Sequence, residues 1–131
     1  MKILKSVESS ICIISINEEG IGSMHFKDGS HQEIEEQMEN LKYIIEITNN
    51  INTPFVVTAG ENVTISREAR DNSLKIEDIS PMYGTAVVVQ NMAYKLITDF
   101  YIKIQKPKRP FAVFTSKEKA YEWCKQFVIK K

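Results

Sequence analysis

Two histidines and two cysteines are the side chains of this 131-residue chain best suited to catalysis or metal binding. A histidine acts as a general base only beside a nucleophile or a carboxylate, and neither His25 nor His31 lies in a GxSxG or HExxH motif. Cys12 and Cys124 are too far apart for a CxxC motif, and the four side chains lack the spacing of zinc ligands. The sequence therefore predicts no catalytic residue and no metal site. Each cysteine falls within an apolar pattern, which predicts two buried free thiols.

The five glycines do not form a phosphate-binding loop. None of them fits GxGxxG or GxxxxGK[ST], the spacings that let backbone amides surround a phosphate. Gly60 and Gly84 lie at the boundaries of predicted strands, where a positive φ angle is often needed. No nucleotide or other cofactor is predicted.

The most concentrated basic cluster precedes the last predicted strand. It consists of Lys103, Lys106, Lys108 and Arg109. Basic residues interleaved with aromatic ones can bind nucleic acid or an acidic membrane surface. The neighbouring Phe100 and Phe111 fall on apolar patterns, however, which predicts that both are buried. The four basic residues are therefore candidates for contact with an anionic partner, and nucleic acid is not favoured.

Charge is unevenly distributed along the chain, although 17 basic and 17 acidic residues give a net charge of zero. Residues 1–65 hold 4 basic and 10 acidic side chains (4 − 10 = −6), and residues 66–131 hold 13 basic and 7 acidic ones (13 − 7 = +6). This asymmetry favours an anionic partner at the C-terminal half or head-to-tail association. Solvated faces of different helices are the simpler alternative.

Strand and helix patterns alternate along the whole chain. Residues 11–16 and 21–27 are joined by a short polar loop and predict a β-hairpin. Ser30 and Glu33 have the spacing of a capping box for a helix that ends at Asn49 and Asn50. Residues at helical spacing predict its buried face: Ile34, Met38, Leu41 and Ile45.

The second half continues with strands at 55–59, 85–89 and 111–114. Ser66 is the predicted N-cap of a short helix over 67–74, and Thr115 and Glu118 have the spacing of a second capping box. Two apolar stripes predict the last two helices. The first is Met92, Ala93, Leu96, Ile97, Phe100 and Ile104; the second is Ala120, Trp123, Cys124, Phe127 and Val128. The order β-β-α-β-α-β-α-β-α predicts an α/β fold with a mixed five-stranded sheet and right-handed parallel crossovers.

Length and composition are those of one globular domain over residues 1–131. Apolar content of 43% and charged content of 26% are near average. No apolar run approaches the roughly 20 residues of a membrane span, and no secretory signal is recognisable. We therefore expect a cytoplasmic protein.

The element order and the pattern Pro-x-x-Pro-x-x-x-Phe-Thr-x-x-x-x-Ala-x-x-Trp, from Pro107 to Trp123, resemble uncharacterised bacterial STAS-like proteins. Those are relatives of the anti-anti-sigma-factor domain and of the CRAL-TRIO lipid-transfer fold. The resemblance implies a SpoIIAA-like fold and a regulatory role. In that family a regulatory serine follows an aspartate at the start of the helix after the central strand. Here that place falls on Ser66 and Arg67, so the Asp-Ser dipeptide is absent.

Three functions follow as hypotheses. The first is a non-enzymatic regulatory or protein-interaction module that binds a partner or a second copy of itself. The second is a domain that binds a small lipid or anion beside the loops at 58–66 and 90–91, because open α/β sheets bind ligands at the carboxyl ends of their strands. The candidate residues of these loops are Thr58, Ser66, Arg67 and Asn91. An enzyme is the third, and it would need a pocket that brings His25 or His31 near a carboxylate.

Overall fold

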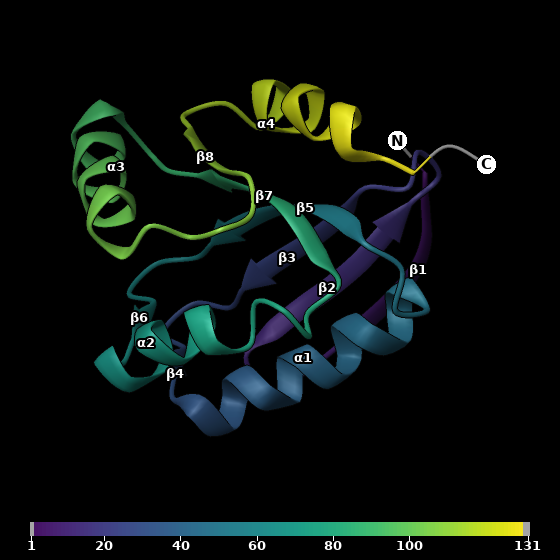
Figure 1. The fold of residues 1–131 in the computed structure, drawn as a ribbon, viewed down its shortest axis with the longest axis horizontal. Helices are drawn as coiled ribbons and strands as arrows, with labels where there is room; N and C mark the ends of the chain where they lie inside the picture. Colours follow the sequence, from purple (N-terminus) through teal and green to yellow (C-terminus); the bar gives the residue numbers. More distant parts are fainter. Residues whose placement is uncertain (1, 130–131) are drawn as a thin grey trace.

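A mixed β-sheet with helices on both faces organises the chain (Figure 1). The computed structural model describes residues 2–129, apart from the side chains of Ile97, Phe100, Tyr101 and Ile104. The sheet consists of β1 (Ile3–Glu8), β2 (Cys12–Asn17), β3 (Gly22–Phe26), β5 (Thr53–Ala59), β7 (Met82–Val88) and β8 (Phe111–Phe114), in that spatial order. The helices are α1 (Ile34–Thr48), α2 (Arg67–Lys75), α3 (Met92–Gln105) and α4 (Lys117–Cys124). A 3-10 turn (Lys125–Phe127) follows α4, and β4 (His31–Gln32) and β6 (Thr64–Ile65) form a separate parallel pair.

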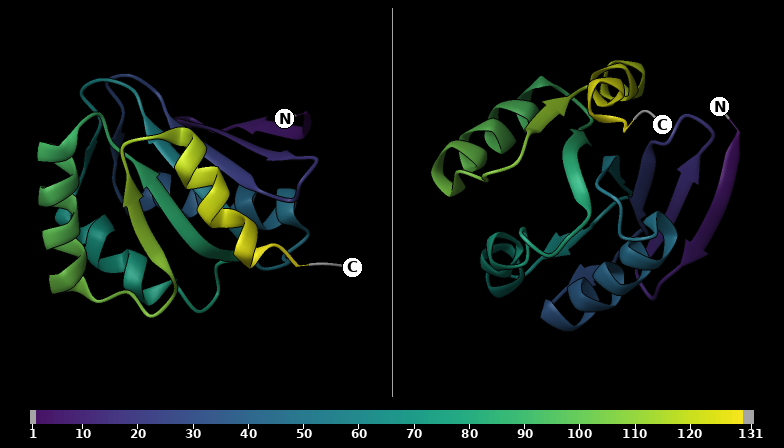
Figure 2. Two further views of the ribbon diagram at one scale, coloured as in Figure 1. Left: turned by 90° about the horizontal axis from the view of Figure 1, so that it is seen from above. Right: turned by 45° about the vertical axis from the view of Figure 1, so that its right-hand side comes forward.

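The sheet changes from antiparallel to parallel at β3. Strands β1, β2 and β3 pair antiparallel, whereas β3, β5, β7 and β8 pair parallel through the helical crossovers. Helices α1 and α2 lie on one face of the sheet and α4 lies on the other, while α3 lies beside β8 (Figure 2). None of the helices in the part of the chain that the structure describes is long and apolar enough to cross a membrane.

Each face of the sheet has its own hydrophobic core. The core on the face covered by α1 consists of Ile11, Cys12, Ile14, Met24, Ile44, Ile47 and Phe55. The core on the face covered by α4 consists of Ile21, Val56, Ala86, Ala120 and Cys124. Phe55 and Val56 are neighbours in β5 and point to opposite faces, because side chains alternate along a strand. Strand β5 therefore ties the two cores together, and both cysteines are buried and free as predicted.

The predicted α/β class and mixed sheet are confirmed, but the sheet has six strands rather than five. The additional strand is β1, whose Ile3 and Leu4 are exposed at 59% and 58%. This strand lies at the edge of the sheet and is held by backbone pairing with β2. It therefore lacks the apolar alternation by which a strand is recognised in sequence.

The predicted start of α1 is wrong, and of its predicted buried face Leu41 is buried and Ile45 half-buried, whereas Ile34 and Met38 are not. Its N-cap is Glu33, which forms a capping box with Glu36, and Ser30 Oγ is the only fully buried polar side-chain atom among the described residues without a partner. Ile34 and Met38 are exposed, because the helix turns a different face to the sheet. The buried residues of α1 are Gln37, Asn40, Leu41, Ile44, Ile47 and Thr48. Because this buried face includes the polar residues Gln37, Asn40 and Thr48, the spacing of apolar residues alone predicted a different face.

The two C-terminal helices also depart from prediction. Ser116, not Thr115, caps α4, since its hydroxyl accepts the backbone N–H of Lys119 at 3.4 Å. In α3, Met92 and Leu96 of the predicted apolar stripe are exposed, because this helix packs on the short edge strand β8. The stripe residues Ile97, Phe100 and Ile104 have side chains outside the described part of the structure.

Candidate functional site

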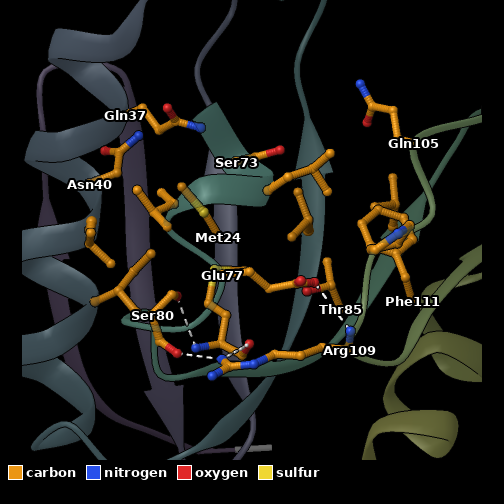
Figure 3. A pocket seen from close by; sticks show the side chains of 18 of the residues that line it. Met24, Gln37, Asn40, Ser73, Glu77, Ser80, Thr85, Gln105, Arg109 and Phe111 are labelled. Carbon is orange, nitrogen blue, oxygen red and sulfur yellow. Dashed lines mark hydrogen bonds between the residues drawn. The ribbon is translucent and has the colours of Figure 1, made fainter. Parts of the chain in front are cut away.

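A cavity of about 300 Å³ lies on the face of the sheet that carries α1 and α2 (Figure 3). Its floor is formed by β3, β5, β7 and β8, and its walls by α1, α2, the end of α3 and the loop that leads to β8. Most lining side chains are apolar. They include Met24, Leu41, Ile44, Val57, Val87 and Phe111. The cavity exists because α2 is short and α3 packs mainly on β8, so that on this face neither helix fills the space over β7.

Amides from β4 and α1 form the polar end of this cavity. Gln32, Gln37 and Asn40 are all more than nine-tenths buried. Gln37 joins α1 to α2, because its Nε2 donates to the carbonyl oxygen of Ala69 at 2.9 Å and its Oε1 accepts from Asn72 at 2.8 Å. Asn40 Nδ2 donates to Gln32 Oε1 at 3.2 Å. These contacts hold the amides in place; Figure 3 shows the side chains of Gln37 and Asn40 beside α1.

Two residues of opposite charge, Glu77 and Arg109, lie at the other end of the cavity. The carboxylate of Glu77 accepts the backbone N–H groups of Lys108 at 3.1 Å and Arg109 at 3.2 Å. The guanidinium of Arg109 donates to the carbonyl oxygens of Ser80 and, at 3.0 Å, of Met82, and it lies 5.6 Å from the centre of the Tyr83 ring. Both charged side chains are thus hydrogen-bonded to backbone groups. These hydrogen bonds connect the loop before β8 to the segment after α2.

The predicted basic cluster therefore divides into two parts. Arg109 lines the cavity and is engaged there, whereas Lys103, Lys106 and Lys108 are exposed. Lys108 Nζ is 3.9 Å from a carboxylate oxygen of Asp78, with both side chains largely in solvent. Such an exposed pair contributes little to stability.

The predicted ligand loops meet at a second hollow, of about 570 Å³, at the carboxyl ends of β5 and β7. Thr58 lines this hollow, and its hydroxyl is 2.8 Å from His25 Nδ1. Ser66 and Asn91 line neither cavity. They cap helices: Ser66 Oγ accepts from Ala69 N at 3.0 Å, and Asn91 Oδ1 accepts from Tyr94 N at 3.1 Å.

Arg67 follows the Ser66 cap and is exposed. It lines neither of the two cavities. The second hollow is lined by half-buried and exposed residues, with Glu61, Asn62 and Gln90 among the exposed ones, and none of its described lining residues is buried. The larger hollow is therefore a surface depression, whereas the cavity beside α1 is lined mainly by buried and half-buried side chains.

His31 does lie near a carboxylate. Its Nε2 is 2.9 Å from Glu33 Oε1 and its Nδ1 is 2.7 Å from Thr64 Oγ1. This hydroxyl–imidazole–carboxylate series joins β4, β6 and the start of α1. Its imidazole and carboxylate are each 53% exposed, and His31 lines neither cavity. In the described residues, no three His, Cys, Asp or Glu side chains are grouped to hold a metal ion.

The amides of the cavity were missed in the sequence, although a signal for them exists. Gln37, Asn40, Leu41, Ile44 and Ile47 recur at the spacing of one helix face, and two of the five are polar. A buried polar residue has to be hydrogen-bonded or to face a polar ligand. The helical spacing of these five residues, with the two polar ones included, identifies this face of α1.

Comparison with known proteins gives a family and a fold. A family model described as "Domain of unknown function (DUF7793)" matches residues 14–128. The crystal structure of an uncharacterized protein from the DUF3478 family of Shewanella loihica PV-4, described as having a SpoIIAA-like fold, is similar in structure. It has a TM-score of 0.56 and 16% sequence identity, and the match covers 94% of each chain. No curated protein matches the sequence. The SpoIIAA-like fold implied by the family resemblance is therefore confirmed.

Proposed function

The chain belongs to the family described as Domain of unknown function (DUF7793), and we propose that it is a non-enzymatic domain that binds one small, mainly apolar molecule in the cavity beside α1. The cavity itself is the observation that carries this proposal. Its volume of about 300 Å³ is at the lower end of the range of small-molecule sites. An apolar ligand gains about 2.5 kcal/mol for each 100 Å² of apolar surface removed from water.

The charges of the site favour binding over chemistry. A catalytic acid or base must be able to exchange a proton with the substrate. Glu77 and Arg109 are the charged residues of the cavity lining, and each is occupied by backbone groups. His31, which has the partners of a general base, lies outside the cavity. The cavity thus offers an apolar surface and fixed amides to a ligand.

Filling the cavity is expected to abolish binding. Val87→Trp places an indole over β7 inside the cavity, whereas Ile79→Trp adds the same group at a residue that is 60% exposed and outside the cavity lining. The neutral dye N-phenyl-1-naphthylamine should bind wild-type protein and the Ile79→Trp variant saturably, with a rise in fluorescence. Its affinity for Val87→Trp should fall at least about tenfold, the equivalent of roughly 1.4 kcal/mol. Equal titration curves for all three proteins would contradict the proposal.

Self-association is a second candidate function, favoured by the exposed start of α3. Met92, Tyr94 and Leu96 are exposed at 59%, 55% and 65%. Met92 and Leu96 are four residues apart and share a helix face. Exposed apolar groups on one element are typical of an interaction surface. The complementary charges are on separate elements: acidic residues lie along α1, and basic residues lie from the end of α3 to β8. A second copy bound head to tail would satisfy both features.

The oligomeric state tests this second function. Sedimentation velocity should show dimers or larger species of wild-type protein at 50 mM salt and fewer at 500 mM, because screening weakens the attraction between exposed charges. Leu96→Glu should give monomers at both salt concentrations. Leu4→Glu is the matched control, since Leu4 is 58% exposed and lies in β1, at the edge of the sheet opposite to β8 and α3. A monomeric wild-type protein at 50 mM salt and high concentration would rule this function out.

A further inference from the structure

The side chain of Gln32 is held in one orientation by a series of hydrogen bonds. Ser9 Oγ accepts the backbone N–H of Cys12 at 2.9 Å and donates to Asn40 Oδ1 at 2.6 Å. With its oxygen engaged by Ser9, Asn40 directs its amide nitrogen to Gln32 Oε1 at 3.2 Å. The oxygen of the Gln32 carboxamide is therefore fixed toward Asn40. Its nitrogen has to point the other way.

The amide nitrogen of Gln32 has no hydrogen-bond partner among the described residues. Gln32 is 6% exposed and lines the cavity. The nitrogen is not sealed inside the protein, because Ser30 Oγ is the one fully buried, unpartnered side-chain atom in the described part of the chain. The open space that it reaches from this buried residue is the cavity. A donor that has lost bulk water without gaining a partner costs about 1–3 kcal/mol, and a ligand acceptor would recover part of that cost.

The charges around the cavity determine which acceptor fits. The guanidinium of Arg109 is bound to two backbone carbonyl groups and the Tyr83 ring. A neutral amide alone does not compensate a buried carboxylate, whose desolvation is far more costly than that of a carbonyl group. Among the described lining residues, Arg109 is the one cation; it lies with the oppositely charged Glu77 at the end of the cavity away from Asn40 and Gln32, so the amide end offers no positive charge to an anion.

We propose that the Gln32 amide binds the neutral carbonyl or hydroxyl oxygen of an otherwise apolar ligand, so that the cavity selects uncharged molecules over fatty-acid-like carboxylates. This inference rests on the proposed ligand-binding function and deepens it. It assigns the polar end of the ligand to the side of the cavity formed by β4 and α1, and its apolar body to the floor over β5 and β7.

Three probes with one carbon skeleton test the selection. Butylbenzene has no acceptor, 4-phenylbutanamide has a neutral one, and 4-phenylbutanoate is an anion at pH 7.5. Each competes with N-phenyl-1-naphthylamine for the wild-type protein and for Gln32→Met, which keeps the length of the side chain but removes the donor. The control is Gln105→Met, because Gln105, at the end of α3, lies across the cavity from Asn40 and α1 (Figure 3).

We expect the amide to compete better than the carboxylate with wild-type protein. Gln32→Met should weaken the amide about three- to tenfold, the range for one neutral hydrogen bond, and leave butylbenzene within twofold. Gln105→Met should change neither. The inference is overturned if Gln32→Met affects the amide and butylbenzene equally, or if wild-type protein binds amide and carboxylate equally; the second result needs no variant to fold. Failure of all three probes to compete would instead overturn the proposed function.

Discussion

Replacing Phe55 with alanine is expected to lower the free energy of unfolding by about 3–5 kcal/mol, the range for removing a buried aromatic ring. Phe55 is 0% exposed and lies at the centre of the core on the α1 side. The ring also lies over Gly22 of the neighbouring strand, with which Phe55 is paired. Its removal leaves a cavity between β3, β5 and α1. Urea denaturation followed by circular dichroism measures the change.

Gly22 should be coupled to Phe55. A Cβ atom at Gly22 would lie 2.4 Å from the Phe55 ring, so Gly22→Ala alone should destabilise the protein by about 1–3 kcal/mol through overpacking. In the Phe55→Ala background the same methyl group occupies vacated space, and its cost should largely disappear. The control is Val56→Ala, which removes a buried side chain from the other face and should be additive with Gly22→Ala. Additivity of Gly22→Ala with Phe55→Ala would contradict the packing described.

Much of the architecture was predictable because local signals and tertiary packing agree. Residues 111–114 form a strand as predicted, since the apolar run follows Pro110 and ends before the cap of α4. The hydroxyl of Ser66 caps α2 as predicted. The parallel order of β5, β7 and β8 follows from their helical crossovers. In these segments the local residue pattern and the tertiary packing favour the same structure.

The edge strand and the orientation of α1 were not predictable in this way. Strand β1 is held by backbone hydrogen bonds that any sequence can form, so its side chains carry little signal. In α1, the apolar Ile34 and Met38 are exposed while Gln37 and Asn40 are buried. Burial of two polar residues is stable only because α2, Ser9 and Gln32 supply their partners. Those partners are distant in sequence from α1 or belong to other elements.

The cavity could not be predicted from the sequence, for a related reason. Its walls come from segments as far apart as Met24 and Phe111, and it is open because of what α2 and α3 leave uncovered. Residue types alone do not indicate such a space. The candidate loops at the strand ends were proposed from a general rule for α/β sheets, and they do line a hollow. The structure places a more enclosed site elsewhere on the sheet.

The two buried thiols should make the protein less stable in alkaline solution. Burial raises the pKa of Cys12 from 9.0 to about 12, although hydrogen bonds with Asn40 and Ser9 oppose the shift. Burial alone raises the pKa of Cys124 from 9.0 to about 12. Between these values the unfolded thiols lose protons that the folded protein keeps, so unfolding is favoured. The stabilising contribution is complete below about pH 9 and falls by up to about 1.4 kcal/mol per pH unit for each thiol above it.

Cys124→Ala isolates this effect, because Cys124 has fewer polar contacts than Cys12. Removal of the Cys124 thiol should lower the free energy of unfolding by a constant amount below pH 9, through lost packing. The difference in the free energy of unfolding between wild-type protein and Cys124→Ala should then shrink as the pH rises toward 11. Lysine and tyrosine titrate in the same range, but they do so in both proteins and cancel in the difference. In the folded protein at pH 8, both thiols should also react with 5,5′-dithiobis(2-nitrobenzoate) only as fast as the chain unfolds, because the thiolate is the nucleophile. A stability difference that stays constant from pH 7 to 11, or thiol modification faster than unfolding, would show that the thiols ionise in the folded state, and that the cores on the two faces of the sheet admit water.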